Sequence, residues 1–212
     1  MGNQARKMEL KEKKLFARGK RGIVSTAFLD GENGIKVAVK EKRFSSKAEF
    51  AIEKEAQWLK ILNKHNIGPK FISFEHNSLI YRFVEGQYLP DFLEKANRID
   101  AINVLKKVMQ QCRKMDELGI NKLEMTRPRR HVVVSKNGKR LVVTMIDFER
   151  CRRTEKPKNV TQFCQFISST EMNDLLADKK LSISREKIIQ YSQNYKRRPN
   201  AANLKKIMAM LK

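Results

Sequence analysis

The sequence is poor in cysteine and in long apolar runs, and each shortage excludes a class of protein. Its 212 residues include three cysteines, Cys112, Cys151 and Cys164, and no two form a Cys-x-x-Cys pair. Neither a disulfide framework nor a zinc site is therefore expected. A membrane-spanning helix needs about 18 or more consecutive apolar residues, and no such run occurs. Residues 1–14 are polar and Lys-rich, unlike a secretory signal, so we expect a cytoplasmic protein with free thiols.

Acidic residues are also scarce relative to basic ones. Lys and Arg number 46 against 23 Asp and Glu, which gives a formal net charge of +23. The excess is concentrated in residues 122–158, with 12 basic and 4 acidic residues, and in residues 196–212, with 6 basic residues and no acid. Such a charge attracts polyanions, of which RNA is a common one. Two interpretations stay open: a surface that binds RNA or a ribonucleoprotein, and an ordinary solvated Lys-rich surface.

The first 84 residues are predicted to form an antiparallel sheet with one inserted helix. Strand patterns in residues 17–42 flank the turn cluster at 30–34 and predict a hairpin. A capping-box pattern at 46–49 precedes apolar residues at helical spacing, so a helix is expected to end before Gly68. Two further short strands are expected at residues 71–74 and 79–84.

The remaining residues, 85–212, are predicted to be mainly helical. A long amphipathic helix is expected at residues 100–118, with Gly119 as a left-handed cap. The β-branched runs at 131–135 and 140–146 flank Asn137-Gly138, a strong hairpin signal. Residues 160–212 are expected to form two or three helices with a break at Pro199. The pattern predicts an α+β fold with an N-terminal domain at 1–84 and a C-terminal domain at 85–212.

Two charges in apolar surroundings are conspicuous in the N-terminal domain. Glu55 lies within the helical stripe formed by Ile52, Leu59 and Leu62. An inward-facing carboxylate costs several kcal/mol unless a cation or donors meet it. Lys40 follows the apolar residues 37–39, so the two charges suggest one buried ion pair. The alternative that Lys40 simply ends its strand stays open.

Two further patterns point toward phosphate chemistry. Asp147 follows the buried-strand pattern of residues 142–146, and a carboxylate at a strand end is a typical way to hold Mg²⁺ beside phosphate oxygens. Gly19 and Gly22 flank Lys20 and Arg21. Closely spaced glycines let backbone amides approach a phosphate, and the two cations add positive charge. Each pattern taken alone also fits an ordinary strand end or turn.

The order of these features resembles the protein kinase-like superfamily. Val37-Ala-Val-Lys40 is similar to its V-A-I-K strand, and Glu55 lies where the partner helix supplies the pairing glutamate. Asp147-Phe-Glu149 stands at the D-F-G position. More closely, the arrangement resembles small predicted archaeal Ser/Thr protein kinases related to the RIO and KEOPS-complex kinases. The resemblance covers residues 19–149 and implies a two-lobed kinase fold with an antiparallel N-lobe sheet and a short helical C-lobe.

The resemblance also implies Mg-ATP as the nucleotide and a role for each matching residue. Lys40, paired with Glu55, would hold the α- and β-phosphates, and Asp147 would carry Mg²⁺. Glu124 stands at the catalytic-loop aspartate and would orient or deprotonate the acceptor hydroxyl. The implied nucleotide-binding residues are Gly19, Lys20, Gly22, Val24, Ala38, Lys40, Arg82, Phe83 and Val84.

The catalytic loop of this sequence departs from the family pattern. The family's asparagine falls on Arg129 or, if two residues are inserted, on His131, which then becomes a metal ligand. The implied activity is phosphorylation of Ser or Thr in a protein, its own chain included. Asp-Phe-Glu also occurs in small-molecule kinases such as choline kinases, and the basic segment after Cys151 lacks Ala-Pro-Glu, which favours a small-molecule substrate. The net charge and Glu124 favour a third alternative, a non-catalytic kinase-fold module that binds RNA or a ribonucleoprotein.

Overall fold

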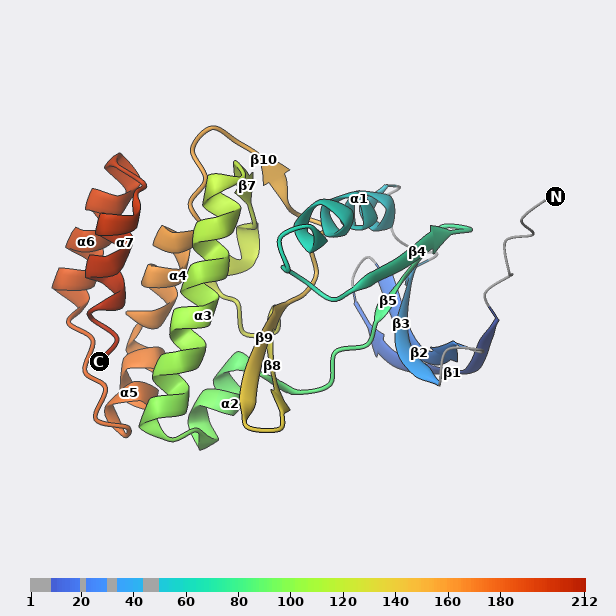
Figure 1. Ribbon diagram of the computed structural model, residues 1–212, viewed down its shortest axis with the longest axis horizontal. Helices are drawn as coiled ribbons and strands as arrows, with labels where there is room; N and C mark the ends of the chain where they lie inside the picture. The colour runs from blue at the N-terminus through green and yellow to red at the C-terminus, as the bar shows by residue number, and fades with distance from the viewer. Residues whose placement is uncertain (1–8, 20–21, 30–33, 44–49) are drawn as a thin grey trace. The chain divides into compact units, whose positions relative to one another are not determined.

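A five-stranded antiparallel sheet forms most of the N-terminal unit (Figure 1). The computed structural model describes residues 9–19, 22–29, 34–43 and 50–212. The chain separates into two units, Met1–Val84 and Glu85–Lys212. The strand order is β1-β2-β3-β5-β4. The strands are β1 (Leu10–Arg18), β2 (Gly22–Leu29), β3 (Ile35–Lys42), β4 (Phe71–Glu75) and β5 (Ser78–Arg82).

The centre of this sheet is apolar because β3 and the two strands beside it, β2 and β5, bury apolar side chains. Ala27, Val37, Val39 and Ile80 form a buried cluster across β2, β3 and β5. The β2–β3 register places Val24 opposite Lys40. Helix α1 (Ala51–Asn63) contacts β3, β4 and β5. The predicted hairpin and inserted helix are therefore confirmed, while the capping box at 46–49 lies outside the described residues.

Strand β1 begins earlier than the sequence predicted. It runs from Leu10, whereas the first strand was expected near residue 17. Residues 11–18 are all exposed, so the segment has no apolar alternation from which a strand could be read. Pairing with β2 holds β1 in place.

The C-terminal unit is built around helix α3 (Arg98–Glu117), whose inward face is fully buried from Ala101 to Met115. A three-stranded sheet of order β6-β8-β9 contacts this helix. The predicted β8–β9 hairpin is confirmed: Asn137 pairs with Arg140, and Gly138, at φ +58°, and Lys139 form the turn between them. Gly119 has φ +65°, which confirms the left-handed cap after α3. The strands are β6 (Gln87–Tyr88), β7 (Ile120–Asn121), β8 (Val132–Asn137), β9 (Arg140–Met145) and β10 (Arg152–Arg153).

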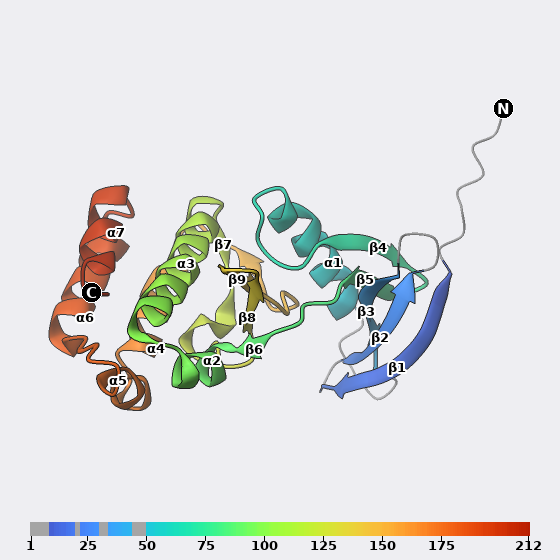
Figure 2. The ribbon, with the colours of Figure 1, turned by 60° about the horizontal axis from the view of Figure 1, so that its bottom comes forward.

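The end of the chain carries four helices, whereas two or three were predicted. Helix α5 (Thr170–Ala177) is short, and its few apolar positions show too weak a helical period to separate it from α4 (Asn159–Ile167). Helices α6 and α7 lie side by side (Figure 2). The remaining helices are α2 (Leu89–Lys95), η1 (Leu123–Thr126), α4 (Asn159–Ile167), α5 (Thr170–Ala177), α6 (Arg185–Arg197) and α7 (Ala201–Met208). Among the described residues, no helix combines the length and apolar composition that a bilayer crossing requires.

Candidate functional site

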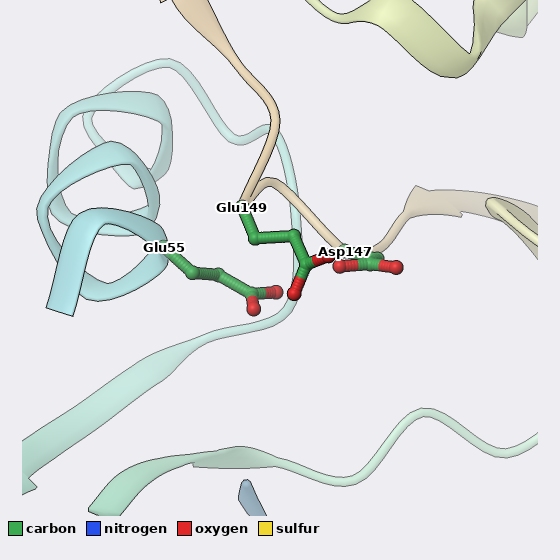
Figure 3. Close-up of side chains that lie close together, drawn as sticks. All are labelled: Glu55, Asp147 and Glu149. Carbon is green, nitrogen blue, oxygen red and sulfur yellow. The ribbon is translucent and has the colours of Figure 1, made fainter. Parts of the chain in front are cut away.

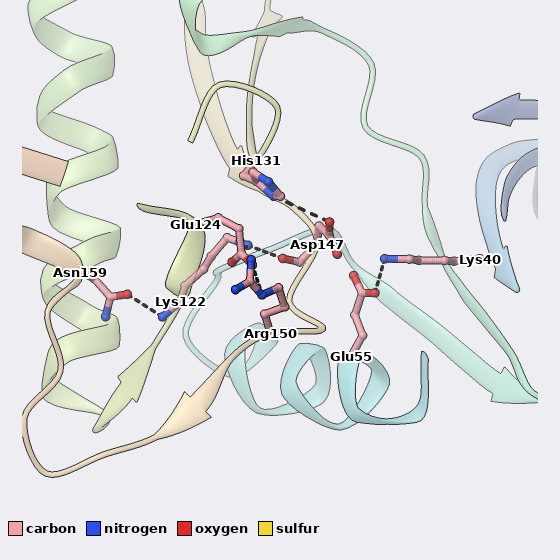
Figure 4. Close-up of polar contacts among 8 residues, drawn as sticks. All are labelled: Lys40, Glu55, Lys122, Glu124, His131, Asp147, Arg150 and Asn159. Carbon is pink, nitrogen blue, oxygen red and sulfur yellow. Dashed lines mark hydrogen bonds and ion pairs between the residues drawn. The ribbon is translucent and has the colours of Figure 1, made fainter. Parts of the chain in front are cut away.

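A buried ion pair joins the centre of the N-terminal sheet to helix α1. The Lys40 Nζ donates to Glu55 Oε2 at 2.5 Å, and the two residues are only 7% and 3% exposed (Figure 4). Lys40 lies on β3, and Glu55 faces inward from α1 between Ile52 and Leu59. The predicted buried pair is confirmed. Because each charge satisfies the other, the lysine is held in one position.

The turn before β2 brings two glycines together in the N-terminal unit. The Gly19 amide donates to the Gly22 carbonyl at 2.9 Å, and the cations Lys20 and Arg21 lie outside the described residues. A Cβ at Gly22 would lie 3.0 Å from the Glu41 carbonyl oxygen. Gly22 therefore lets β2 approach β3 more closely than a larger residue would.

The other implied nucleotide-binding residues lie on β2, on β3 and after β5. Val24 and Ala38 lie on neighbouring strands, and Ala38 is 1% exposed. The Arg82 amide donates to the Lys70 carbonyl at 2.8 Å, and the Phe83 amide donates to the Lys36 carbonyl at 3.0 Å. Both amides are thus used in hydrogen bonds within the unit.

Asp147 adopts an unusual backbone conformation at the end of strand β9. Its φ is +63°, a left-handed conformation that Asp tolerates better than most residues and that is often found at functional sites. Its carboxylate lies 3.8 Å from His131 Nδ1 and within 4.8 Å of a Glu149 carboxylate oxygen. Figure 3 draws Asp147 and Glu149 on the loop after β9, and Glu55 on α1. Two neighbouring carboxylates offer the oxygen ligands that Mg²⁺ prefers.

The loop before β8 contains both residues that the sequence offered for the family's asparagine, Arg129 and His131. His131 contacts Asp147, and the Ile146 amide donates to the His131 carbonyl at 3.0 Å. Arg129 instead pairs with Glu171 on α5. The geometry therefore brings His131, and not Arg129, beside the strand-end carboxylate.

A second charged cluster surrounds Glu124 on the turn η1. The Lys122 Nζ lies 3.3 Å from Glu124 Oε2 and also donates to the Asp147 carbonyl oxygen (Figure 4). The same ammonium lies 4.9 Å from the centre of the Phe148 ring. The Arg150 Nε lies 3.6 Å from Glu124 Oε1. Glu124 is thus held between two cations, and Lys122 links it to the Asp147-Phe148 turn.

Buried polar groups from α3 and α4 support this turn from behind. Asn159 Oδ1 accepts from the Lys122 amide at 2.8 Å, and Asn159 Nδ2 donates to Asp116 Oδ1 at 2.7 Å. Asp116 also accepts from the Val160 amide and from the Tyr195 hydroxyl. Burial raises the pKa of Asp116 from its usual value, although these hydrogen bonds oppose the shift. The position of Lys122 is therefore fixed by both its side chain and its backbone.

Sequence reasoning missed several of these residues. Lys122 was counted within a basic surface stretch, yet its side chain is completely buried. Asp116 and Asn159 were not singled out. They bond to each other across 43 residues of the chain, and no local pattern marks either one. The sequence also did not predict a pocket of about 670 Å³ in the C-terminal unit, whose lining includes Glu85, Asn97, Asp100 and Ser135.

The comparisons with known proteins identify the fold. No family model and no curated protein sequence matches the chain. Among solved structures, the chain is similar to the Rio2 kinase from Chaetomium thermophilum in its ADP/Mg²⁺-phosphoaspartate complex, with 10% sequence identity and a TM-score of 0.59. The match covers 96% of this chain and 70% of that chain. The chain has a protein kinase-like fold, whereas the closer resemblance to archaeal and KEOPS-complex kinases stays a prediction.

Proposed function

We propose that this chain is an ATP-dependent phosphotransferase that phosphorylates Ser or Thr in a protein, its own chain included. The buried Lys40–Glu55 pair is the observation that carries the proposal. In protein kinases a strand lysine held by a helix glutamate contacts the nucleotide phosphates. A buried ion pair adds little to stability compared with apolar residues of similar size, so stability alone is a weak reason for this one.

The residues at the end of β9 fit a magnesium ion. Asp147 and Glu149 present carboxylate oxygens within 4.8 Å of one another. Bound Mg²⁺ would neutralise charge on the nucleotide phosphates. In the proposal Asp147 carries the metal, and His131 assists by contacting the Asp147 carboxylate. Lys40 holds the α- and β-phosphates, and Val84 meets the adenine edge.

Glu124 is proposed to orient the acceptor hydroxyl or to accept its proton. It lies on η1, which the Lys122 amide and side chain hold in place. A second candidate function, nucleotide binding without transfer, is favoured by the same geometry. Both Glu124 oxygens face cations, Lys122 on one side and Arg150 on the other, which leaves the carboxylate engaged before any substrate arrives.

The decisive measurement is transfer of labelled phosphate from Mg-ATP to the purified protein and to cell-extract proteins. We expect transfer by the wild type, loss of about 10²-fold or more with Asp147→Asn or Lys40→Met, and a drop of about 10²–10⁴ with Glu124→Gln. Asp178→Asn, an exposed carboxylate after α5, is the matched control and should retain full activity.

Two other outcomes would overturn the leading proposal, and a third would remove the proposed metal site. Label that appears in a metabolite fraction and not in protein identifies a small-molecule kinase. Nucleotide binding that depends on Lys40, with no transfer to any acceptor, identifies the second candidate. Transfer that survives Asp147→Asn would remove the proposed metal site.

A further inference from the structure

A polar groove lies between helices α4 and α6 of the C-terminal unit, on faces that the proposed phosphotransfer does not use. Its volume is about 700 Å³. On α6 the lining residues Arg185, Ser192 and Lys196 follow helical spacing, so they share one face. We call this feature the α4–α6 groove and define it by these residues together with Lys158 and Gln162.

The charge in the α4–α6 groove is of one sign. Lys158, Arg185 and Lys196 line it, and no acidic residue does. All three are exposed, and none of their side chains forms an ion pair with any residue that the structure describes. Three unneutralised cations around one concavity attract a ligand with several negative charges.

The uncharged lining adds hydrogen-bond acceptors to this positive charge. Eight of the twelve lining residues carry a hydroxyl or a carboxamide. The Thr161 hydroxyl donates to the Lys158 carbonyl and the Ser192 hydroxyl to the Ile189 carbonyl, so their lone pairs remain for a ligand donor. The Gln162 Oε1 is buried and accepts no hydrogen bond from the described residues. A buried acceptor without a donor is unfavourable, and a ligand hydroxyl would satisfy it once the Gln162 side chain rotates to expose this oxygen to the groove.

We propose that the α4–α6 groove binds the sugar–phosphate backbone of single-stranded RNA. Phosphate oxygens pair with Lys158, Arg185 and Lys196, and ribose 2′-hydroxyls donate to acceptors such as Gln162 Oε1. No aromatic ring lines the groove, so base stacking is absent and binding is insensitive to base sequence. The charge of +23 adds long-range attraction. This site does not depend on the proposed phosphotransfer.

The test measures binding of a fluorescent single-stranded RNA of about twelve nucleotides, a length within the known range of single-strand sites, and of DNA with the same sequence. Fluorescence anisotropy is recorded over a range of salt concentrations. The groove variant combines Lys158→Gln, Arg185→Gln and Lys196→Gln. The control variant makes the same change in charge and residue type on the exposed β8–β9 hairpin, through Lys136→Gln, Lys139→Gln and Arg140→Gln.

The groove variant should lose about three phosphate contacts, so the slope of log affinity against log salt should shrink by about 2. If the wild type and the groove variant bind equally at 1 M salt, this difference in slope makes the groove variant about a hundredfold weaker at 0.1 M. The control variant should keep the wild-type slope. Gln162→Met should reduce the preference for RNA over DNA, because it removes an acceptor for the 2′-hydroxyl. Thermal unfolding should be the same in the wild type and the two triple variants, since the substituted cations are exposed.

The proposal is overturned if the wild type binds no RNA. It is also overturned if the groove and control variants lose equal slope, since binding then follows net charge alone. Binding of a phosphorylated peptide that depends on the groove cations, without RNA binding, would assign the groove to a phosphoprotein instead. Equal affinity of the wild type for RNA and DNA would remove the role given to Gln162.

Discussion

Replacing Lys122 by methionine tests whether the turn that bears Glu124 is held by one buried charge. The substitution keeps an unbranched side chain and removes the ammonium group. That group contacts the Glu124 carboxylate, donates to the Asp147 carbonyl and lies over the Phe148 ring. All three contacts are lost together, and Glu124, which is largely buried, keeps Arg150 as its one cationic partner among the described residues.

The expected cost follows from these contacts. Removing one partner of a buried ion pair typically costs about 3–5 kcal/mol. Arg150 still faces Glu124, and it is half exposed, so we expect a loss of about 3 kcal/mol, at the lower end of that range. The double variant Lys122→Met/Glu124→Gln should be more stable than Lys122→Met alone, because no carboxylate is left facing a missing partner.

Urea unfolding followed by far-ultraviolet circular dichroism measures these differences. Lys114→Met is the matched control, because Lys114 pairs with Glu117 at 3.5 Å on the exposed surface of α3. An exposed pair contributes about 0–1 kcal/mol, so this variant should be nearly as stable as the wild type. Equal stability of Lys122→Met and Lys114→Met would refute the assignment of Lys122 as the buried link, as would a double variant that is less stable than Lys122→Met.

Three further predictions concern the C-terminal unit. Gly86→Ala should destabilise it by about 1–3 kcal/mol in urea unfolding, because the new Cβ would lie 2.4 Å from the Val134 carbonyl oxygen; an unchanged midpoint would contradict this. Burial raises the pKa of Asp116 above 3.8, so the folded state holds this proton more tightly than the unfolded chain. The stability that this provides is fully present below the unfolded pKa and is lost as pH rises through the folded pKa. The wild type should therefore lose stability relative to Asp116→Asn over that rise, and a constant difference would be evidence against the shift. Burial raises the pKa of the Cys112 and Cys164 thiols, so both should react with iodoacetamide only on unfolding; native labelling at the rate of free cysteine would disprove it.

The parts of the molecule that the sequence predicted are those with a local signal. Glu55 interrupts an apolar helical stripe, and that interruption made the pair with Lys40 predictable. Asn137-Gly138 located the β8–β9 hairpin in the same way. Lys122 gave no such signal, because it lies in a short irregular segment and takes its partners from residues 25 and 37 positions away. Its burial is a property of the assembled unit.

The contacts of Asn159 determine when, during synthesis, the chain can hold the Glu124 turn in place. This residue begins α4, yet its side chain holds the backbone of Lys122, 37 residues earlier, and reaches Asp116 on α3. A growing chain in which η1 and β9 have left the ribosome still lacks the group that fixes the Glu124 turn. Contacts that close long loops form late in folding. A ribosome-bound chain that stops before α4 would carry every residue proposed for phosphotransfer and still be unable to hold them in place.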